Sequence, residues 1–291
     1  MVLIMRQDRR RGERLQSGMP PVIALLTDFG LRDHYAGAMK GAILSACPEA
    51  TLVDVTHEVP AHDVGAGALA LDAAYRHFPA GTVFVTVVDP GVGSERRPIA
   101  ARAGRWLFVG PDNGVLTYVL EADPAARVHL IANAGLFRVP TCSVFHGRDV
   151  FGPVAACLAC GLPLEEVGPA VGDPVRLELP PKTRTEDGWS GAVLHVDRFG
   201  NLTTNLAVGD LAALAEGSLD SLEVRLGPEV LPLVRAYSDV APGRACALVG
   251  SSGRLEIAVR EGRAEGLPGA GKGARVLVRR RAGGVLNSRA R

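Results

Sequence analysis

A carboxylate and an arginine flank a glycine-rich turn at the end of an apolar stretch of this chain. Residues 82–88 are apolar and β-branched, which indicates a buried strand, and Asp89 follows directly. The turn PGVGSE at residues 90–95 then leads to Arg96. Ligands of open α/β sheets bind at the carboxyl edge of the strands, so this pair could act on a ligand there. Taken alone, these eight residues could equally form a solvated loop with a surface ion pair.

Two further clusters share this arrangement. The apolar residues 23–26 lead into TDFGLRD, which holds Asp28 and Asp33, and VFHGRD at 144–149 holds His146 and opens a helical pattern. Together the three segments resemble the S-adenosylmethionine (SAM) hydroxide adenosyltransferase family, the adenosine-forming SAM hydrolases, which are related to SAM-dependent fluorinases and chlorinases. The resemblance runs from about residue 22 to about residue 279, and includes PDNG at 111–114, DRFGN at 197–201 and YSD at 237–239.

The reaction that this resemblance implies is hydrolysis of SAM, as substrate, to adenosine and L-methionine without a metal or organic cofactor. Cleavage at the ribose C5′ converts a sulfonium into a neutral thioether, so the leaving group needs no general acid. The requirement is a water held in line with the C5′–S bond and made more nucleophilic. Bringing an incipient hydroxide against a sulfonium cancels charge, which a dry pocket favours.

Asp89, Arg96 and His146 match the catalytic triad of the family position by position. Arg96 stays protonated, so it can hold an oxygen and stabilise developing hydroxide character but cannot be the base. Asp89 could accept a proton or orient Arg96, and His146 could share the water or act as the base near neutral pH. The identity of the proton acceptor stays open at this point, and a packing role is the alternative for His146 taken alone.

The resemblance also implies contacts to three parts of SAM. Asp28 corresponds to the residue that binds the ribose hydroxyls, and His62 occupies a position that borders the ribose. Phe199 and Tyr237 are candidates for stacking on adenine, with core packing as the alternative. The residues expected at the methionine end are Asp33, Asp197 and Asn201 for its ammonium and Ser251 or Ser252 for its carboxylate.

A SAM-dependent halogenase of the chlorinase type is the main alternative. A halide pocket disfavours a carboxylate beside the nucleophile, because two anions repel each other and both would have to be desolvated. At the position of Asp89 the halogenases carry an uncharged aromatic residue. Fluorinases also carry a serine where Gly147 stands and an insertion after the glycine loop that this sequence lacks. These features favour water over halide.

Two other classes use the same residues differently. A non-catalytic SAM- or nucleoside-binding sensor would need the binding residues but would leave the triad without a purpose. A metal-dependent hydrolase could use Asp28, Asp33, Asp89 and His146 as ligands, although the neighbouring Arg96 would compete with a dication. We therefore expect no metal site in the catalytic centre.

The composition limits the remaining classes. The chain has 291 residues, 47% of them apolar, enough for one large or two ordinary domains with a substantial core. A net charge of +1 argues against a general nucleic-acid surface, and no apolar run is long enough to span a bilayer. Five cysteines without a secretory leader favour the cytoplasm. Cys157 and Cys160 have a metal or redox spacing, but no second pair completes a zinc site, so we expect small core residues.

The residues 21–178 alternate between strand and helix patterns. Strands are expected at 23–26, 51–55, 82–88, 106–109 and 128–131, and helices at 33–47, 63–78 and 115–120, with Asp33 and Asp63 as N-caps. This alternation predicts a parallel sheet covered by helices, and the resemblance implies a Rossmann-like α/β catalytic domain.

The character of the sequence changes after a linker at residues 179–186. Short strand patterns at 192–196, 222–226, 247–249, 255–259 and 275–278 predict a small β-barrel or sandwich over 187–281, and the resemblance implies the β-barrel. Residues 1–20 are expected to be a disordered tail and residues 282–291 a solvated one, and Met19 could be the true start. The resemblance implies a homotrimer in which each site lies between the N-terminal domain of one subunit and the C-terminal domain of the next.

Overall fold

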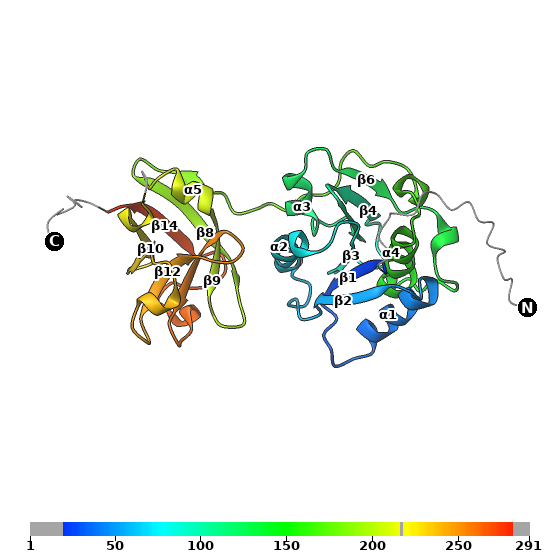
Figure 1. Ribbon diagram of the computed structural model, residues 1–291, viewed down its shortest axis with the longest axis horizontal. Helices are drawn as coiled ribbons and strands as arrows, with labels where there is room; N and C mark the ends of the chain where they lie inside the picture. The colour runs from blue at the N-terminus through cyan, green and yellow to red at the C-terminus, as the bar shows by residue number, and fades with distance from the viewer. Residues whose placement is uncertain (1–19, 216–217, 282–291) are drawn as a thin grey trace, which may run out of the picture. The chain divides into compact units, whose positions relative to one another are not determined.

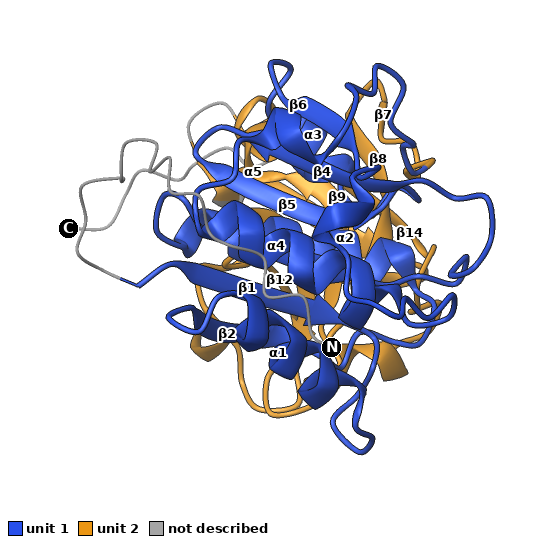
Figure 2. Cartoon of the chain, turned by 90° about the vertical axis from the view of Figure 1, so that its right-hand side faces the viewer, with its two compact units in different colours: residues 1–177 blue, residues 178–291 orange. Residues whose placement is uncertain are grey.

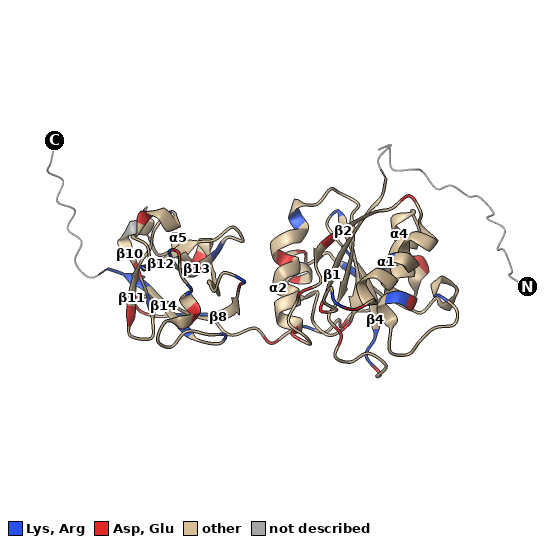
Figure 3. Cartoon of the chain, turned by 90° about the horizontal axis from the view of Figure 1, so that it is seen from below, with Lys and Arg blue, Asp and Glu red and all other residues tan. Residues whose placement is uncertain are grey.

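The computed structural model describes residues 20–215 and 218–281 (Figure 1). The chain divides into two compact units, residues 1–177 and 178–291, which Figure 2 colours separately. Apart from residue 20, the two predicted tails lie outside the described residues, as does Met19. Within the described ranges, no helix is both long enough and apolar enough to cross a membrane. Charged residues of both signs are spread over both units (Figure 3).

The first unit is built on a six-stranded mixed sheet. In spatial order its strands are β2 (Thr51–Thr56), β1 (Val22–Thr27), β3 (Val83–Val87), β5 (Trp106–Pro111), β4 (Pro98–Ala103) and β6 (Arg127–Leu130). The first four are parallel, as predicted, whereas β4 is antiparallel to both of its neighbours. The prediction of a wholly parallel sheet was therefore wrong. A two-residue turn with Gly104 at a φ of +54° joins β4 to β5 as a hairpin.

Helices cover both faces of this sheet (Figure 1). They are α1 (Tyr35–Ala46), α2 (Val64–Ala74), α3 (Thr117–Ala122) and α4 (Gly152–Ala159). A hydrophobic core lies on each face of the sheet, and alternate residues of the central strands point into one or the other. Val83 and Val85 pack with α1 and α4, and Phe84 packs with α2 and α3. Burial of both faces explains the nearly continuous apolar character of these strands.

The two predicted helix caps have different outcomes. The side chain of Asp63 accepts a hydrogen bond from the backbone N–H of Ala66, which confirms it as the N-cap of α2. Asp33 is not a cap, because α1 begins two residues later, after His34, and its start has no side-chain cap. Residues 31–34 form bends before the helix, which moves Asp33 away from the first turn.

The second unit is an antiparallel, barrel-like sheet of eight strands. The path runs β11 (Glu229–Pro232), β10 (Leu222–Leu226), β14 (Arg275–Arg280), β8 (Gly188–Val196), β9 (Leu202–Ala207), β13 (Arg254–Val259) and β12 (Ala245–Val249), with β7 (Thr183–Arg184) paired to β8. A bridge between Leu233 and Ala247 joins the two ends of the path, so the sheet nearly closes. A further helix, α5 (Val208–Ala212), follows β9. The interior holds one apolar cluster that includes Val193, Leu202 and Ile257.

Candidate functional site

Two predicted carboxylates lie at the same edge of the first sheet. Strands β1 and β3 are parallel neighbours, and Thr27 is in register with Val87 at their carboxyl ends. Asp28 follows β1 directly and Asp89 follows β3 by two residues, so both belong to the loops at this edge. This is the edge at which open α/β sheets bind ligands.

The structure brings Asp89, Arg96 and His146 together in one hydrogen-bonded set. The Arg96 Nε donates to both Asp89 oxygens at 3.0 Å, and its Nη2 donates to Asp89 Oδ2 at 2.5 Å. The same Nη2 lies 2.7 Å from the Nδ1 of His146. The side chains of Asp89 and Arg96 are only 5% and 10% exposed, so a charge-assisted pair is held largely away from solvent.

The glycine-rich turn explains how Arg96 reaches back to Asp89. The hydroxyl of Ser94 donates to the carbonyl of Gly91 at 2.6 Å, and the backbone N–H of Arg96 donates to that hydroxyl at 3.3 Å. Gly93 has a φ of +81°, which glycine adopts without a steric penalty. The sequence PGVGSE therefore folds into a tight reversal that sets the spacing between the carboxylate and the guanidinium.

The contact with Arg96 assigns the protonation state of His146. A guanidinium can only donate, so Nδ1 accepts and the ring proton lies on Nε2. The pKa of His146 is lowered below its ordinary value, first by burial and then by the neighbouring Arg96. His146 is therefore a neutral ring that presents an Nε2–H donor near neutral pH.

One donor of Arg96 is not used by the protein. Its Nη1 is buried and has no hydrogen-bond partner among the described residues. A buried donor without a partner costs about 1–3 kcal/mol, so such atoms are uncommon in folded proteins. This Nη1 is suited to bind an oxygen of a small ligand or of water.

A buried carboxylate outside the predicted set fixes the His146 turn. His146 precedes a π-helical turn, Gly147–Phe151, that continues into α4. Asp149 in this turn is fully buried and accepts two bonds of 2.7 Å from Arg148 and one of 2.8 Å from the backbone N–H of Cys142. The only sequence signal was an Arg-Asp pair directly after the histidine and glycine.

A second network outside the predicted set holds the Asp28 turn. His57, which is 2% exposed, contacts the hydroxyl of Thr27 through Nδ1 at 2.8 Å and Asp54 through Nε2 at 3.1 Å. Asp54 only accepts, so Nε2 carries a proton towards it, and Nδ1 shares a hydrogen bond with the Thr27 hydroxyl. The backbone N–H of Gly30 donates to the carbonyl of His57 at 2.7 Å. His57 thus fixes the residues on both sides of Asp28 and Phe29.

Of the other predicted residues of this unit, two are in contact with each other and one is exposed to solvent. Asp28 and His62 are in contact, but through the backbone N–H of His62, which donates to Asp28 Oδ2 at 2.9 Å, and not through its ring. Asp33 is exposed, in the bends before α1. In the described part of the chain, the four residues of the metal-hydrolase alternative do not form a metal-ligand group.

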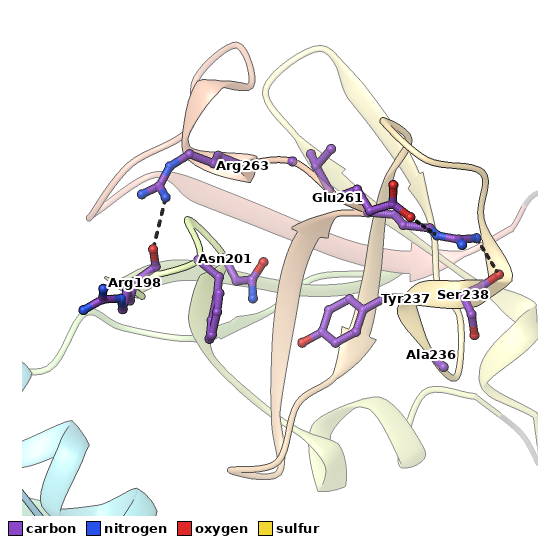
Figure 4. Close-up of a pocket in the computed structure, with 11 residues that line it drawn as sticks. Arg198, Asn201, Ala236, Tyr237, Ser238, Glu261 and Arg263 are labelled. Carbon is purple, nitrogen blue, oxygen red and sulfur yellow. Dashed lines mark hydrogen bonds and ion pairs between the residues drawn. The ribbon is translucent and has the colours of Figure 1, made fainter.

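Three of the predicted residues of the second unit line a pocket (Figure 4). Phe199, Asn201 and Tyr237 line it together with Arg198, Ala236, Ser238 and residues 259–263. Asp197 supports the turn beneath Phe199 and Asn201, because its carboxylate accepts from both backbone N–H groups at 2.8 and 2.9 Å. Ser251 and Ser252 lie apart from this pocket lining, in the exposed turn between β12 and β13.

Glu256 is a further residue that sequence reasoning missed, and it contacts Tyr237 of the pocket lining. The hydroxyl of Tyr237 donates to Glu256 Oε1 at 2.5 Å, which fixes the direction of an aromatic ring that is 43% exposed. Burial raises the pKa of Glu256, and the charge of Asp197 raises it further.

Comparison with known proteins identifies the class to which this pair of units belongs. Residues 23–168 match the SAM hydroxide adenosyltransferase N-terminal domain, and residues 191–277 match the C-terminal domain of the same family. The chain therefore belongs to the SAM hydroxide adenosyltransferase family.

Individual relatives agree with this assignment. The chain is 42% identical over 261 residues to a Salinispora tropica protein named (R)-S-adenosyl-L-methionine hydrolase, covering 89% of this chain and 97% of that one. It is 32% identical over 269 residues to an Actinoplanes fluorinase, covering 82% and 90%. A crystal structure of an uncharacterized conserved protein from Thermotoga maritima superposes with a TM-score of 0.82 at 38% identity, covering 88% of this chain and 99% of that one.

Proposed function

We propose that this chain hydrolyses SAM to adenosine and L-methionine by direct attack of water on C5′. The observation that carries the proposal is the buried Asp89–Arg96–His146 set, with one guanidinium donor left for an outside oxygen. The similarity to (R)-S-adenosyl-L-methionine hydrolases supports it. In this role Asp89, Arg96 and His146 are the catalytic residues.

The contacts indicate which of the three residues holds the water and which accepts its proton. Arg96 Nη1 donates to one lone pair of the water and leaves the other free to attack C5′, while neutral His146 holds the guanidinium in place through Nδ1. As the C5′–O bond forms, the C5′–S bond breaks and its electron pair returns to sulfur. The resulting protonated alcohol is a strong acid, so a weak base is sufficient. We propose Asp89 as the acceptor, because Nδ1 of His146 already accepts from Arg96.

The remaining predicted residues complete the proposed substrate site. Asp28 binds the ribose hydroxyls with His62 beside it, and Phe199 and Tyr237 hold the adenine. The methionine end is assigned to Asp33, Asp197, Asn201, Ser251 and Ser252.

The proposal extends to the domains, the location and the oligomeric state of the enzyme. The α/β unit is a Rossmann-like catalytic domain and the second unit is a β-barrel, in a cytoplasmic enzyme that needs no cofactor. The resemblance to the family implies a homotrimer, and we propose one whose sites lie between subunits. Measurement of the molar mass by light scattering tests the trimer.

The products formed in chloride buffer test the proposed function. Incubation with SAM should give adenosine and L-methionine in equal amounts, and in ¹⁸O-labelled water the label should enter the 5′-hydroxyl. A chlorinated adenosine would establish the halogenase alternative, and SAM that stays bound and unchanged would establish the sensor. Loss of activity after prolonged chelation, with recovery on adding a divalent metal, would support the metal-dependent hydrolase.

The lowered pKa of His146 predicts the acid limb of the pH profile. Protonation would break the bond from Arg96 to Nδ1 and place two cations side by side. We therefore expect kcat/KM to stay level through neutral pH and to fall only below pH ~6.5, the ordinary pKa of histidine. The contribution of His146 to stability is likewise complete above that value and is lost as the pH falls through its lower folded pKa. A profile that already falls above pH 7 would contradict the neutral ring.

The His57 network predicts a specific loss of substrate affinity. His57→Ala removes the partner of Thr27 and loosens the Asp28 turn, so KM for SAM should rise by on the order of 10-fold while kcat changes less. His57→Asn, which retains a polar group near Nδ1, should recover part of the affinity. The exposed His77→Ala serves as the control. A fall in kcat at unchanged KM would show that His57 does not act through the binding turn.

A further inference from the structure

Two helix ends and a loop bring two thiols and a carboxylate together in the first unit. Cys47 is the C-cap of α1 and Cys160 is the C-cap of α4. One ligand atom each of Cys47, Glu49 and Cys160 lies within 4.8 Å of the other two, and the Cys160 Sγ is 3.9 Å from Glu49 Oε1. The expectation of a small core residue is wrong for Cys160, which is exposed and lies near Cys47 of another helix.

We propose that Cys47, Glu49 and Cys160 bind one thiophilic divalent cation, with Zn²⁺ as the ion that best fits the donors. Zinc binds thiolate at about 2.3 Å and carboxylate oxygen at about 2.0–2.2 Å, which in a tetrahedral site separates two sulfurs by about 3.8 Å. The observed spread of up to 4.8 Å exceeds that separation by only about 1 Å, which side-chain rotation can supply. Water would fill the fourth position on the exposed side.

The electrostatics of this position favour a cation over free thiolates. The carboxyl ends of α1 and α4 both carry partial negative charge, and Glu49 adds a full one. Burial raises the pKa of the Cys47 thiol to about 12, with Cys160 as the next cause, and burial also raises the pKa of Cys160. Two negative helix ends and a carboxylate therefore favour a positive ion at this position.

The position in the fold indicates a structural role. The catalytic residues occupy the carboxyl edge of the parallel strands, whereas α1 runs from that edge and ends just before β2 starts, at the opposite edge. An ion here would link the C-terminal ends of α1 and α4, which pack together over one face of the sheet. It would increase the free energy of unfolding and would take no part in the reaction.

Titration of the metal-free, reduced full-length protein with Co²⁺ and then Zn²⁺ tests the site. We expect one ion per chain, a sulfur-to-cobalt charge-transfer band that Zn²⁺ abolishes, and a Tm that rises with Zn²⁺ concentration. Cys160→Ala, a change at an exposed position, should weaken binding by more than the roughly 10–100-fold typical of residues that only support a ligand. Cys47→Ala should do the same, and Glu49→Gln should weaken binding less.

Cys157→Ala is the matched control, because Cys157 lies on the same helix but outside the group, and it should bind like the wild type. Loss of binding in Cys157→Ala, wild-type binding in Cys160→Ala, or the absence of a charge-transfer band would overturn the site. Failure of the reduced protein to bind metal while oxidant joins Cys47 to Cys160 would also overturn it. Because these readouts do not use SAM, they are independent of the proposed function.

Discussion

Replacement of Arg96 by alanine should lower the kcat of SAM hydrolysis by on the order of 10²–10³-fold, the scale of a lost electrostatic contact to the reacting atoms. The same change leaves the nearly buried carboxylate of Asp89 without its partner and releases Nδ1 of His146. Binding of SAM should weaken much less, because this residue faces the nucleophile and not most of the substrate. Single-turnover rates combined with calorimetry separate the two effects.

The other members of the set should follow the same pattern. Asp89→Asn and His146→Ala should each reduce turnover by about 10²-fold or more, with smaller changes in affinity. Arg76→Ala removes a half-exposed arginine that pairs with Asp72 on α2, and it should leave the rate unchanged. Near-normal turnover in all three triad variants would remove the catalytic assignment.

Replacement of Asp149 by alanine should destabilise the first unit by on the order of 3 kcal/mol, about 10²-fold in the unfolding equilibrium. The side chain is fully buried and neutralises Arg148, which is itself 27% exposed, so the cost lies at the lower end for a broken buried pair. Its pKa is held low chiefly by Arg148, so this stabilisation is present at neutral pH and is lost on acidification below the ordinary aspartate value of about 3.9.

The unfolding free energy is measured by denaturant titration. Hydrogen exchange of the backbone amides of α4 reports on this part of the first unit. Asp173→Ala is a suitable control, because this carboxylate also pairs with an arginine but is 83% exposed, and it should change stability little. Asp149→Asn should lie between the wild type and Asp149→Ala, since an amide accepts fewer bonds and carries no charge. Equal stability of Asp149→Ala and the wild type would show that the π-helical turn is held by other contacts.

Local patterns predicted most elements of the first sheet, and they failed where local signals were weak. The strand β4 was missed because its sequence PIAARA contains three alanines, which favour strands weakly. Its position was decided by the hairpin to β5 and not by its own composition. In the second unit, β9 and β11 were also missed, although β9 alternates buried and half-buried residues in the manner of a strand.

In the candidate site, too, the sequence predicted some residues and missed others. The type and spacing of Asp89, Arg96 and His146 were sufficient to group them through resemblance, but the tautomer of His146 follows only from its contact with Arg96. His57, Asp149 and Glu256 were missed because their roles arise from contacts with other segments. His57, for example, meets Thr27 thirty positions earlier in the chain. Sequence reasoning identified the groups that face a ligand better than the groups that support them.

The main-chain bond from His62 to Asp28 has a consequence for how this position can vary. His62 has a φ of +67°, in the left-handed region that few residues other than glycine, asparagine, aspartate and histidine occupy readily. The N–H that meets the carboxylate is present in every residue except proline. Position 62 is therefore constrained in backbone shape and not in side-chain chemistry, so substitutions there can alter the border of the site while the anchor of Asp28 is retained.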